Sequence, residues 1–348
     1  MFQPSSIEQR VVLICDRPHW AYDAIAQALV QQNHDAALRL EIAYAKGTAA
    51  LASAVQDADL VFVLGWQVAA TWQDSWWARL RDRSGIVESR WTWLEPARAL
   101  AGLHSHHGWD GRRTTPEADV APPPGLVEFL RRFRGINAVS RRLSELFRRA
   151  GLDVAYTPNG VDETVFRPLA PMAREGPLRV GYSGSLKHDW RKGITEFIQP
   201  ACELPGIELK LAMPAEDHYV SHAQMPQFYN AIDVYLCASS SEGFSLSVLE
   251  AAACGRPIIS TRVGGSEELI VGGVNGFLVE RRVDAIRDKL RYFVEHRDAV
   301  VQMGAQNRRL IEEHWSWRER APAWLAFIRA GLEARLRERA APEPTGVR

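Results

Sequence analysis

The chain has 348 residues, 46% of them hydrophobic, which is enough to build two domains of ordinary size with separate cores. Its 42 basic residues balance its 42 acidic ones, so composition argues against a general attraction to nucleic acid or to an anionic membrane. Four scattered cysteines without CxxC spacing argue against a zinc site or a disulfide framework, and favour reduced thiols in a cytoplasmic protein.

Short apolar runs alternate with helical patterns through the first half of the chain. The runs at 11–15, 40–44, 58–65, 99–106 and 135–140 are bounded by polar or turn-forming residues and predict strands. Helix-like segments lie between most of them. This alternation is typical of an open, largely parallel α/β sheet.

The alternation of strands and helices starts again after a proline-rich, polar segment that predicts a hinge. Apolar runs beginning at 178, 207, 233, 257 and 276 predict the strands of a second α/β domain. We therefore expect a first domain at 1–168, a hinge at 169–177, a second domain at 178–315, a terminal helix at 316–340 and a disordered tail at 341–348.

The predicted terminal helix carries an apolar stripe. Trp324, Ile328, Leu332 and Leu336 recur every four residues, while the other positions are rich in arginine and glutamate. Because such a stripe must be buried, we expect this helix to dock on another part of the protein.

An arginine-rich segment lies at 129–149 and raises the question of a membrane-bound acceptor. A buried helical stripe is predicted there for Leu126, Phe129, Leu130 and Phe133, with Arg131, Arg132 and Arg134 outside it. This spacing favours a solvated helix face over a membrane patch, so we do not predict membrane attachment, although contact with a membrane surface stays open.

The segment "SSSEGFSLSVLEAAACGRPIIS", at 239–260, contains Glu242 and Glu250. It follows a predicted strand and opens a predicted helix, so its loop should lie at the carboxyl edge of the sheet. Backbone N–H groups at 244–246 are unpaired donors suited to a phosphate or sugar oxygen. Glu250 lies roughly 7 Å along the helix from Ser245, so the two acids can contact different parts of one extended ligand.

This segment resembles the EX7E signature of GT-B glycosyltransferases of family 4, also called group 1. Further segments at 139–162, 180–193, 225–236 and 272–279 follow in the order that this family shows. The resemblance implies two Rossmann-like domains facing each other across a cleft. It also implies that the first domain binds the acceptor, that the second binds a nucleotide-sugar, and that the last helix crosses back to the first domain.

The resemblance implies roles for the acidic and basic residues of the second domain. Glu250 corresponds to the acid that accepts the ribose hydroxyls, Glu242 to the acid beside the donor sugar, and Lys192 to the cation facing the diphosphate. A structural alternative stays open, in which Glu250 completes a capping box with Ser247 and Glu242 is solvated. The implied donor site also includes Gly184, Ser185, Arg191, Gly243, Phe244, Ser245 and Leu246.

The chain departs from the family at the turn after Gly184. An arginine usually follows this glycine, whereas Ser185 follows it here, so half of the expected cationic clamp is missing. Arg191 or Lys187 could replace it. The alternative is that Arg191 and Lys192 only lie on the surface of a loop without a functional role.

In the first domain, three histidines at 104–107 follow a predicted strand. The resemblance favours His106 or His107 as a contact to the donor sugar, while burial in an interface or metal binding by His-x-His spacing stay open. On the acceptor side, Arg17, His19 and Trp20 are candidates, although Trp20 could equally cap the core. The glycine-rich loop usual for the family is absent there.

The sequence thus predicts a retaining, hexosyltransferase-like enzyme that uses a nucleoside diphosphate sugar, for instance a UDP or GDP sugar, and an unidentified hydroxyl acceptor. We expect no cofactor and no catalytic metal, because GT-B enzymes generally work without one. Two alternatives stay open: a GT-B nucleotide-sugar epimerase and a non-catalytic protein that binds sugar nucleotides.

Overall fold

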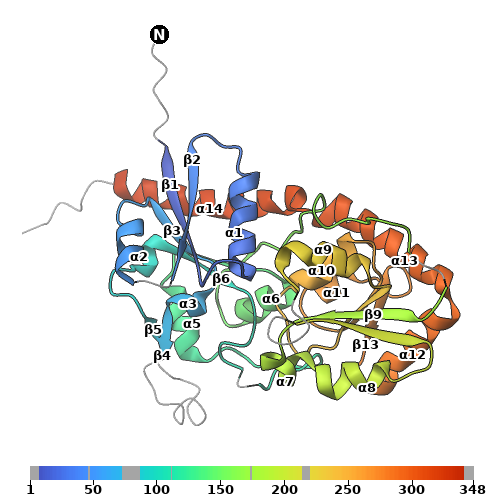
Figure 1. Cartoon of the computed structure of the whole chain (residues 1–348). Helices are drawn as coiled ribbons and strands as arrows, with labels where there is room; N and C mark the ends of the chain where they lie inside the picture. The colour runs from blue at the N-terminus through green and yellow to red at the C-terminus, as the bar shows by residue number, and fades with distance from the viewer. Residues whose placement is uncertain are drawn as a thin grey trace, which may run out of the picture.

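The computed structural model describes residues 8–45, 48–72, 87–110, 112–172, 175–213 and 220–340. The described residues form two lobes, each built on a parallel sheet with helices around it (Figure 1). The predicted tail at 341–348 and part of the predicted hinge lie outside the described residues.

The first lobe contains a six-stranded parallel sheet in the order β2-β1-β3-β6-β7-β8. The strands are β1 (Gln9–Cys15), β2 (Leu38–Tyr44), β3 (Leu60–Val63), β6 (Ala99–Leu103), β7 (Gly135–Ala138) and β8 (Ala155–Tyr156). The helices are α1 (Ala21–Gln32), α2 (Thr48–Val55), α3 (Trp66–Ala69), α5 (Pro124–Arg131) and α6 (Arg141–Arg149). A separate antiparallel pair joins β4 (Ala70–Trp72) and β5 (Val87–Ser89). All five strands predicted for this half of the chain are confirmed.

The second lobe contains a five-stranded parallel sheet in the order β10-β9-β11-β12-β13. The strands are β9 (Leu178–Ser183), β10 (Ile207–Ala212), β11 (Val234–Cys237), β12 (Ile258–Thr261) and β13 (Gly276–Val279). The helices are α7 (Asp189–Lys192), α8 (Gln199–Cys202), α9 (Met225–Asn230), α10 (Leu246–Ala253), α11 (Ser266–Leu269), α12 (Val283–Glu295) and α13 (Arg297–Leu310). The strands predicted here are confirmed as well.

The terminal helix, α14 (Trp317–Ala340), runs from the second lobe along the first (Figure 1). It packs against α1, β3 and β6, so the predicted docking is confirmed. Trp324, Ile328 and Leu332 are buried, whereas Leu336 is 36% exposed. The buried part of the stripe therefore ends before Leu336.

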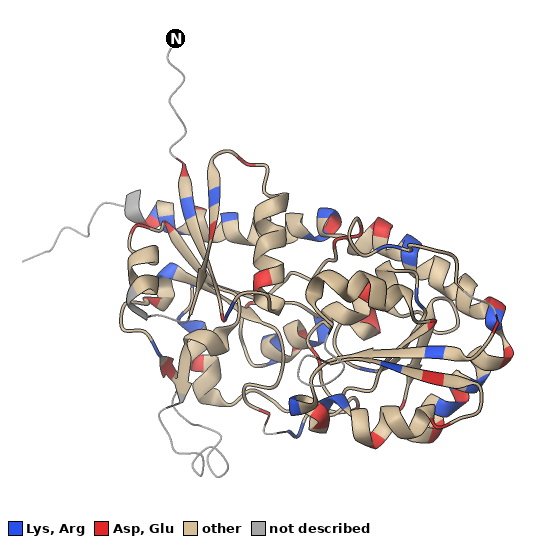
Figure 2. Ribbon diagram, viewed as in Figure 1, with Lys and Arg blue, Asp and Glu red and all other residues tan. Residues whose placement is uncertain are grey.

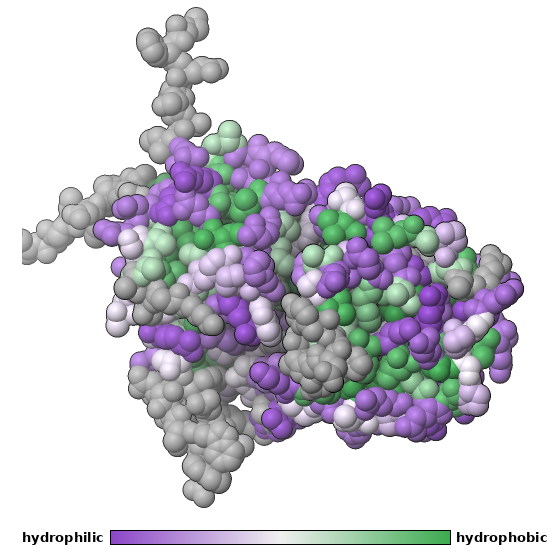
Figure 3. Space-filling view, in the orientation of Figure 1, coloured by the Kyte–Doolittle hydropathy of each residue, from purple (hydrophilic) through white to green (hydrophobic). Residues whose placement is uncertain are grey.

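The four apolar side chains of the predicted stripe are all buried, three of them on α5 and Phe133 just after its end. One arginine placed outside this stripe is an exception. Only 8% of the Arg134 side chain is exposed, and its guanidinium pairs with Glu338 of α14. Basic and acidic residues are interspersed over both lobes (Figure 2), and hydrophilic residues cover much of the visible face (Figure 3).

The four cysteines are buried and unpaired, as expected from their spacing. None of the helices in the described ranges is both long enough and apolar enough to cross a membrane.

Candidate functional site

The candidate site lies at the carboxyl edge of the second sheet. From β9 the chain proceeds outward to the edge strand β10 and then returns to β11 on the other side of β9. Ligands of open α/β sheets bind in the crevice at such a switch point. Gly184 and Ser185 follow β9, and Glu242 lies in the loop after the adjacent parallel strand β11, so the structure brings these predicted donor residues to the same edge of the sheet.

Glu242 is the centre of a buried ionic cluster. Lys192 Nζ lies 2.5 Å from its Oε1, and Arg191 Nη1 lies 2.8 Å from its Oε2. Ser239 Oγ donates a further hydrogen bond of 2.7 Å to Oε1. The two cations come from α7, fifty residues before the glutamate, and no local sequence pattern joins them to it.

The cluster keeps Glu242 ionised. Burial alone would raise its pKa, but the charges of Arg191 and Lys192, together with the hydrogen bonds from Lys192 and Ser239, lower the pKa to about 2. At neutral pH this side chain therefore has no proton to donate. It can accept hydrogen bonds or stabilise positive charge, but it is not a general acid.

Arg191 also fixes the loop that carries Glu242. Its Nη1 donates to the carbonyl oxygen of Ser241 at 2.8 Å, and its own carbonyl accepts from the N–H of Ser240 at 2.8 Å. Helix α7 ends at Lys192 and is capped by Gly193, whose φ of 69° favours glycine. The replacement of the missing arginine by Arg191 stays a prediction, since this guanidinium is bound to the same carboxylate as Lys192.

Glu250 lies on α10 and is partly exposed. The hydroxyl of Tyr229 donates to its Oε2 at 2.7 Å. Burial raises the pKa of Glu250, and the hydrogen bond from Tyr229 and the charge of His222 counteract part of this effect. The capping-box alternative is wrong, because Ser245 is the N-cap residue and its Oγ contacts the hydroxyl of Ser247 at 2.9 Å.

The start of α10 lies between the two lobes. A Cβ at Gly243 would be 1.8 Å from the carbonyl oxygen of His104, so only glycine permits this approach of the lobes. Phe244 packs on Trp315 with ring centroids 5.0 Å apart, and its carbonyl accepts from Asn159 Nδ2 at 3.3 Å. Leu246 begins the helix and is partly exposed.

The two candidate histidines have different surroundings. His106 is 1% exposed and bridges the lobes, with Nδ1 3.1 Å from Ser241 Oγ and Nε2 3.0 Å from Asp119 Oδ1. His107 is exposed and lies beside the ring of Trp190, at a centroid distance of 5.6 Å. Desolvation by the surrounding side chains and the charge of Arg191 lower the pKa of His107. A contact from either histidine to a donor sugar stays a prediction.

His104 is largely covered and packs against the rings of Tyr22 and Trp324. Burial lowers its pKa to about 3, so this imidazole is neutral at physiological pH. Among the described residues, no group of three or more histidine, cysteine, aspartate or glutamate side chains could hold a metal ion.

The acceptor candidates lie in the loop between β1 and α1. The guanidinium of Arg17 stacks 3.3 Å from the centroid of the Trp20 ring, and the indole is 45% exposed. The backbone N–H of His19 donates to Asp23 at 2.7 Å. The structure therefore does not place Trp20 in the core, and the role of these three residues in acceptor binding stays a prediction.

A cavity of about 360 Å³ lies beside this loop, at the carboxyl ends of β1, β2 and β3. Its lining residues are Asp16, Tyr22, Ala45, Gln67, Val68 and Arg90. The three acceptor candidates do not line it, although Asp16 and Tyr22 flank them in sequence.

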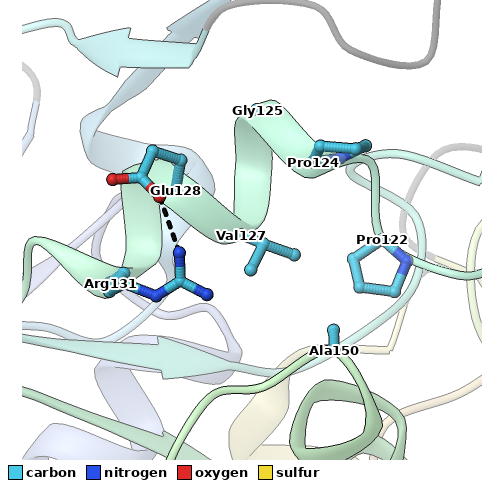
Figure 4. Close-up of a pocket in the computed structure, with 7 residues that line it drawn as sticks. All are labelled: Pro122, Pro124, Gly125, Val127, Glu128, Arg131 and Ala150. Atoms are coloured by element: carbon cyan, nitrogen blue, oxygen red, sulfur yellow. Dashed lines mark hydrogen bonds and ion pairs between the residues drawn. The ribbon is translucent and has the colours of Figure 1, made fainter.

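A second cavity, of about 530 Å³, lies on the surface formed by α5 and the residues around it (Figure 4). Its charged residues, Glu128 and Arg131, pair with each other at 2.7 Å. None of the predicted site residues lines this cavity.

Sequence reasoning missed three polar partners of the site: Ser239, Asp119 and Tyr229. Ser239 belongs to the quoted motif and lies three residues before Glu242, which is a signal that could have identified it. Asp119 and Tyr229 lie in other parts of the chain, and their side chains reach the site only through the fold.

Comparison with known families supports the resemblance. Residues 218–310, which include both glutamates, match the model of the family described as glycosyl transferases group 1. Trehalose synthase from Thermococcus litoralis is 41% identical over 88 residues, which are 25% of this chain and 21% of that protein. D-inositol 3-phosphate glycosyltransferase from Gordonia bronchialis is 32% identical over 242 residues, 67% of this chain and 50% of that protein.

The chain thus spans half or less of the length of these two curated relatives. Two solved structures resemble it over nearly its whole length, both at 15% identity. Sucrose-phosphate synthase from Thermosynechococcus elongatus has a TM-score of 0.68 and covers 96% of this chain and 100% of its own. HepE from Anabaena, solved with UDP and glucose, has a TM-score of 0.66 and covers 92% and 100%.

The two parallel sheets and these structural neighbours show that the chain has the GT-B fold. The resemblance predicted from the sequence is supported over residues 218–310, which match the model of the glycosyl transferases group 1.

Proposed function

We propose that this protein is a retaining glycosyltransferase that transfers a sugar from a nucleoside diphosphate donor to a hydroxyl acceptor. The observation that carries the proposal is the placement of Glu242 on a loop, and of Lys192 and Glu250 on two helices, beside the switch point of the second sheet. The group 1 relatives named above support transfer as the reaction.

In this proposal, the diphosphate of the donor binds beside Lys192. The lysine is 16% exposed and already lies against Glu242, so an incoming phosphate oxygen would share or replace that carboxylate as its partner. A cation in this position stabilises the negative charge that accumulates on the departing diphosphate. The diphosphate of the donor therefore pairs with the ammonium group of Lys192, while the ion pair with Arg191 keeps Glu242 in place.

The ionised state of Glu242 sets its role. A carboxylate with a pKa of about 2 can hold sugar hydroxyls and stabilise positive charge at the anomeric carbon, but cannot protonate the leaving group. The acceptor hydroxyl forms its bond to the anomeric carbon from the side of the leaving diphosphate as that bond breaks. Its proton passes to the departing phosphate oxygen, so no base from the protein is needed. Attack from the side of the leaving group retains the anomeric configuration.

Donor binding is tested by thermal shift. With a panel of UDP, GDP, ADP and dTDP sugars, we expect one nucleotide to raise the melting temperature of the protein, because a ligand that binds only the folded state stabilises it. Glu250→Ala should abolish this rise, because it removes the acceptor proposed for the ribose hydroxyls. Glu203→Gln, at an exposed acid of the same lobe, should keep it. Absence of stabilisation by every member of the panel would contradict donor binding.

Product analysis tests the reaction itself. With the donor identified above and a set of hydroxyl acceptors, NMR spectra should show a new glycosidic linkage with the anomeric configuration of the donor. An inverted anomeric centre would rule out retention. A changed sugar still attached to the nucleotide would indicate the epimerase alternative instead.

A further inference from the structure

A chain of hydroxyl groups links the two ends of the proposed donor site. At one end, Ser183 is the last residue of β9 and precedes the turn at Gly184 and Ser185, called the phosphate turn here because the family resemblance places part of the cationic clamp for the diphosphate there. Its Oγ lies 3.2 Å from the hydroxyl of Tyr229, which donates to Glu250 at 2.7 Å at the other end. The chain therefore spans from the phosphate turn to the acid proposed for the ribose.

Tyr229 is held rigidly at the middle of this chain. Its side chain is fully buried. Its ring makes edge contacts with Phe166, Phe228 and Tyr235 at centroid distances between 5.5 and 6.0 Å. A ring packed in this way has one orientation, so its hydroxyl fixes the position of the carboxylate that it touches.

We propose that Tyr229 is a positioning residue for donor binding, which holds Oε2 of Glu250 and thereby presents Oε1 to the ribose hydroxyls of a nucleoside diphosphate. Ser183 ties Tyr229 to the phosphate turn, and so keeps a set distance between the ribose and diphosphate subsites. The consequence is selectivity for ribose over 2′-deoxyribose, because a carboxylate oxygen held in one position accepts a hydrogen bond only from a hydroxyl at the matching position of the sugar.

The charge state of Glu250 agrees with this role. Burial raises its pKa, and the hydrogen bond from Tyr229 acts in the opposite direction, which keeps more of the carboxylate ionised. The other titratable groups facing it are His222, whose charge also lowers its pKa, and Cys254, one turn further along α10. Removing the Tyr229 hydroxyl should therefore raise the pKa of Glu250 further.

The inference rests on the proposed function, and its test uses UDP, GDP and ADP with their 2′-deoxy forms, titrated calorimetrically into the full chain. For the nucleotide that binds, Tyr229→Phe is expected to weaken the ribose form roughly tenfold. It should leave the deoxy form within about twofold, so that the ribose preference largely disappears. In Tyr229→Phe, the loss of nucleotide affinity at acidic pH should also begin at a higher pH than in wild type, because the pKa of Glu250 is raised.

Two further variants separate positioning from packing. Tyr235→Phe removes a buried hydroxyl that contacts Ser183 at 3.0 Å, and should keep the ribose preference of the wild type. In a Glu250→Ala background, Tyr229→Phe should cause no further loss, because Tyr229 acts through Glu250. Circular dichroism and melting curves check that each variant is folded.

The outcomes distinguish the two proposals. If wild type binds a ribonucleotide but Tyr229→Phe keeps its ribose preference, the positioning role is wrong while donor binding stands. An equal loss in Tyr229→Phe and Tyr235→Phe would assign the effect to packing and overturn the role as well. If dTDP is the only nucleotide that binds wild type, the ribose preference and this inference fail while donor binding stands. If neither dTDP nor any of the three ribonucleotides binds, the proposed function fails and this inference fails with it.

Discussion

Glu242→Gln is expected to lower the rate of sugar transfer at least about 100-fold, because it removes the charge proposed to stabilise the anomeric centre. The amide of glutamine has nearly the same shape as the carboxylate, so a lower transfer rate would result from the lost charge and not from a change in volume. It should also destabilise the folded protein by on the order of 3 kcal/mol, since Arg191 and Lys192 lose the carboxylate that both contact. Steady-state kinetics and denaturant unfolding measure the two effects.

The pH dependence of stability supplies an independent check on Glu242. Its folded-state pKa, about 2, lies below the usual value of a glutamate, so the ion pairs stabilise the protein above about pH 4.5. This stabilisation is lost as the pH falls toward 2. Glu242→Gln should remove that part of the acid dependence, whereas Glu203→Gln should retain it. Wild-type transfer rates in Glu242→Gln would contradict the proposed role.

Trp324→Ala is expected to lower the free energy of unfolding by about 4 kcal/mol. The indole is fully buried, packs near Phe62, and donates from Nε1 to the carbonyl oxygen of Pro158 at 2.9 Å. Alanine would leave a cavity and an unpaired carbonyl where α14 docks on the first lobe. Denaturant unfolding followed by tryptophan fluorescence and circular dichroism measures the change.

The same helix offers a matched control. Leu336 belongs to the predicted apolar stripe but is 36% exposed, so Leu336→Ala should change the free energy of unfolding by less than about 1 kcal/mol. If the two variants were equally stable, the docking of α14 would contribute little to the stability of the protein, and the crossing helix would need another explanation.

The strands could be predicted because each is a short apolar run with its own boundaries, a property of neighbouring residues. The order of the strands could not, since it depends on pairings between segments far apart, such as β9 with β11. That pairing brings Lys192 to Glu242. The family resemblance therefore identified Lys192 and Glu242 in two separate segments of the sequence, while the ion pair between them became visible only in the fold.

His106 shows that the sequence also does not determine the surroundings of a single side chain. Residue type and position made His106 a reasonable contact for a sugar. In the structure it lies between Ser241 of one lobe and Asp119 of the other, and is almost fully buried. Histidine suits both settings, so the sequence cannot choose between them. His107, its neighbour, is the more accessible of the two.

The sequence by itself determined the α/β alternation, the glutamate motif and the apolar stripe of the last helix, because these depend on residues that are close along the chain. Only the tertiary structure decided that two cations meet Glu242, that Tyr229 holds Glu250, and that Gly243 lies against His104. Hydrogen bonds and ion pairs act over a few ångströms, so they depend on where the folded strands and helices place residues that are distant in sequence.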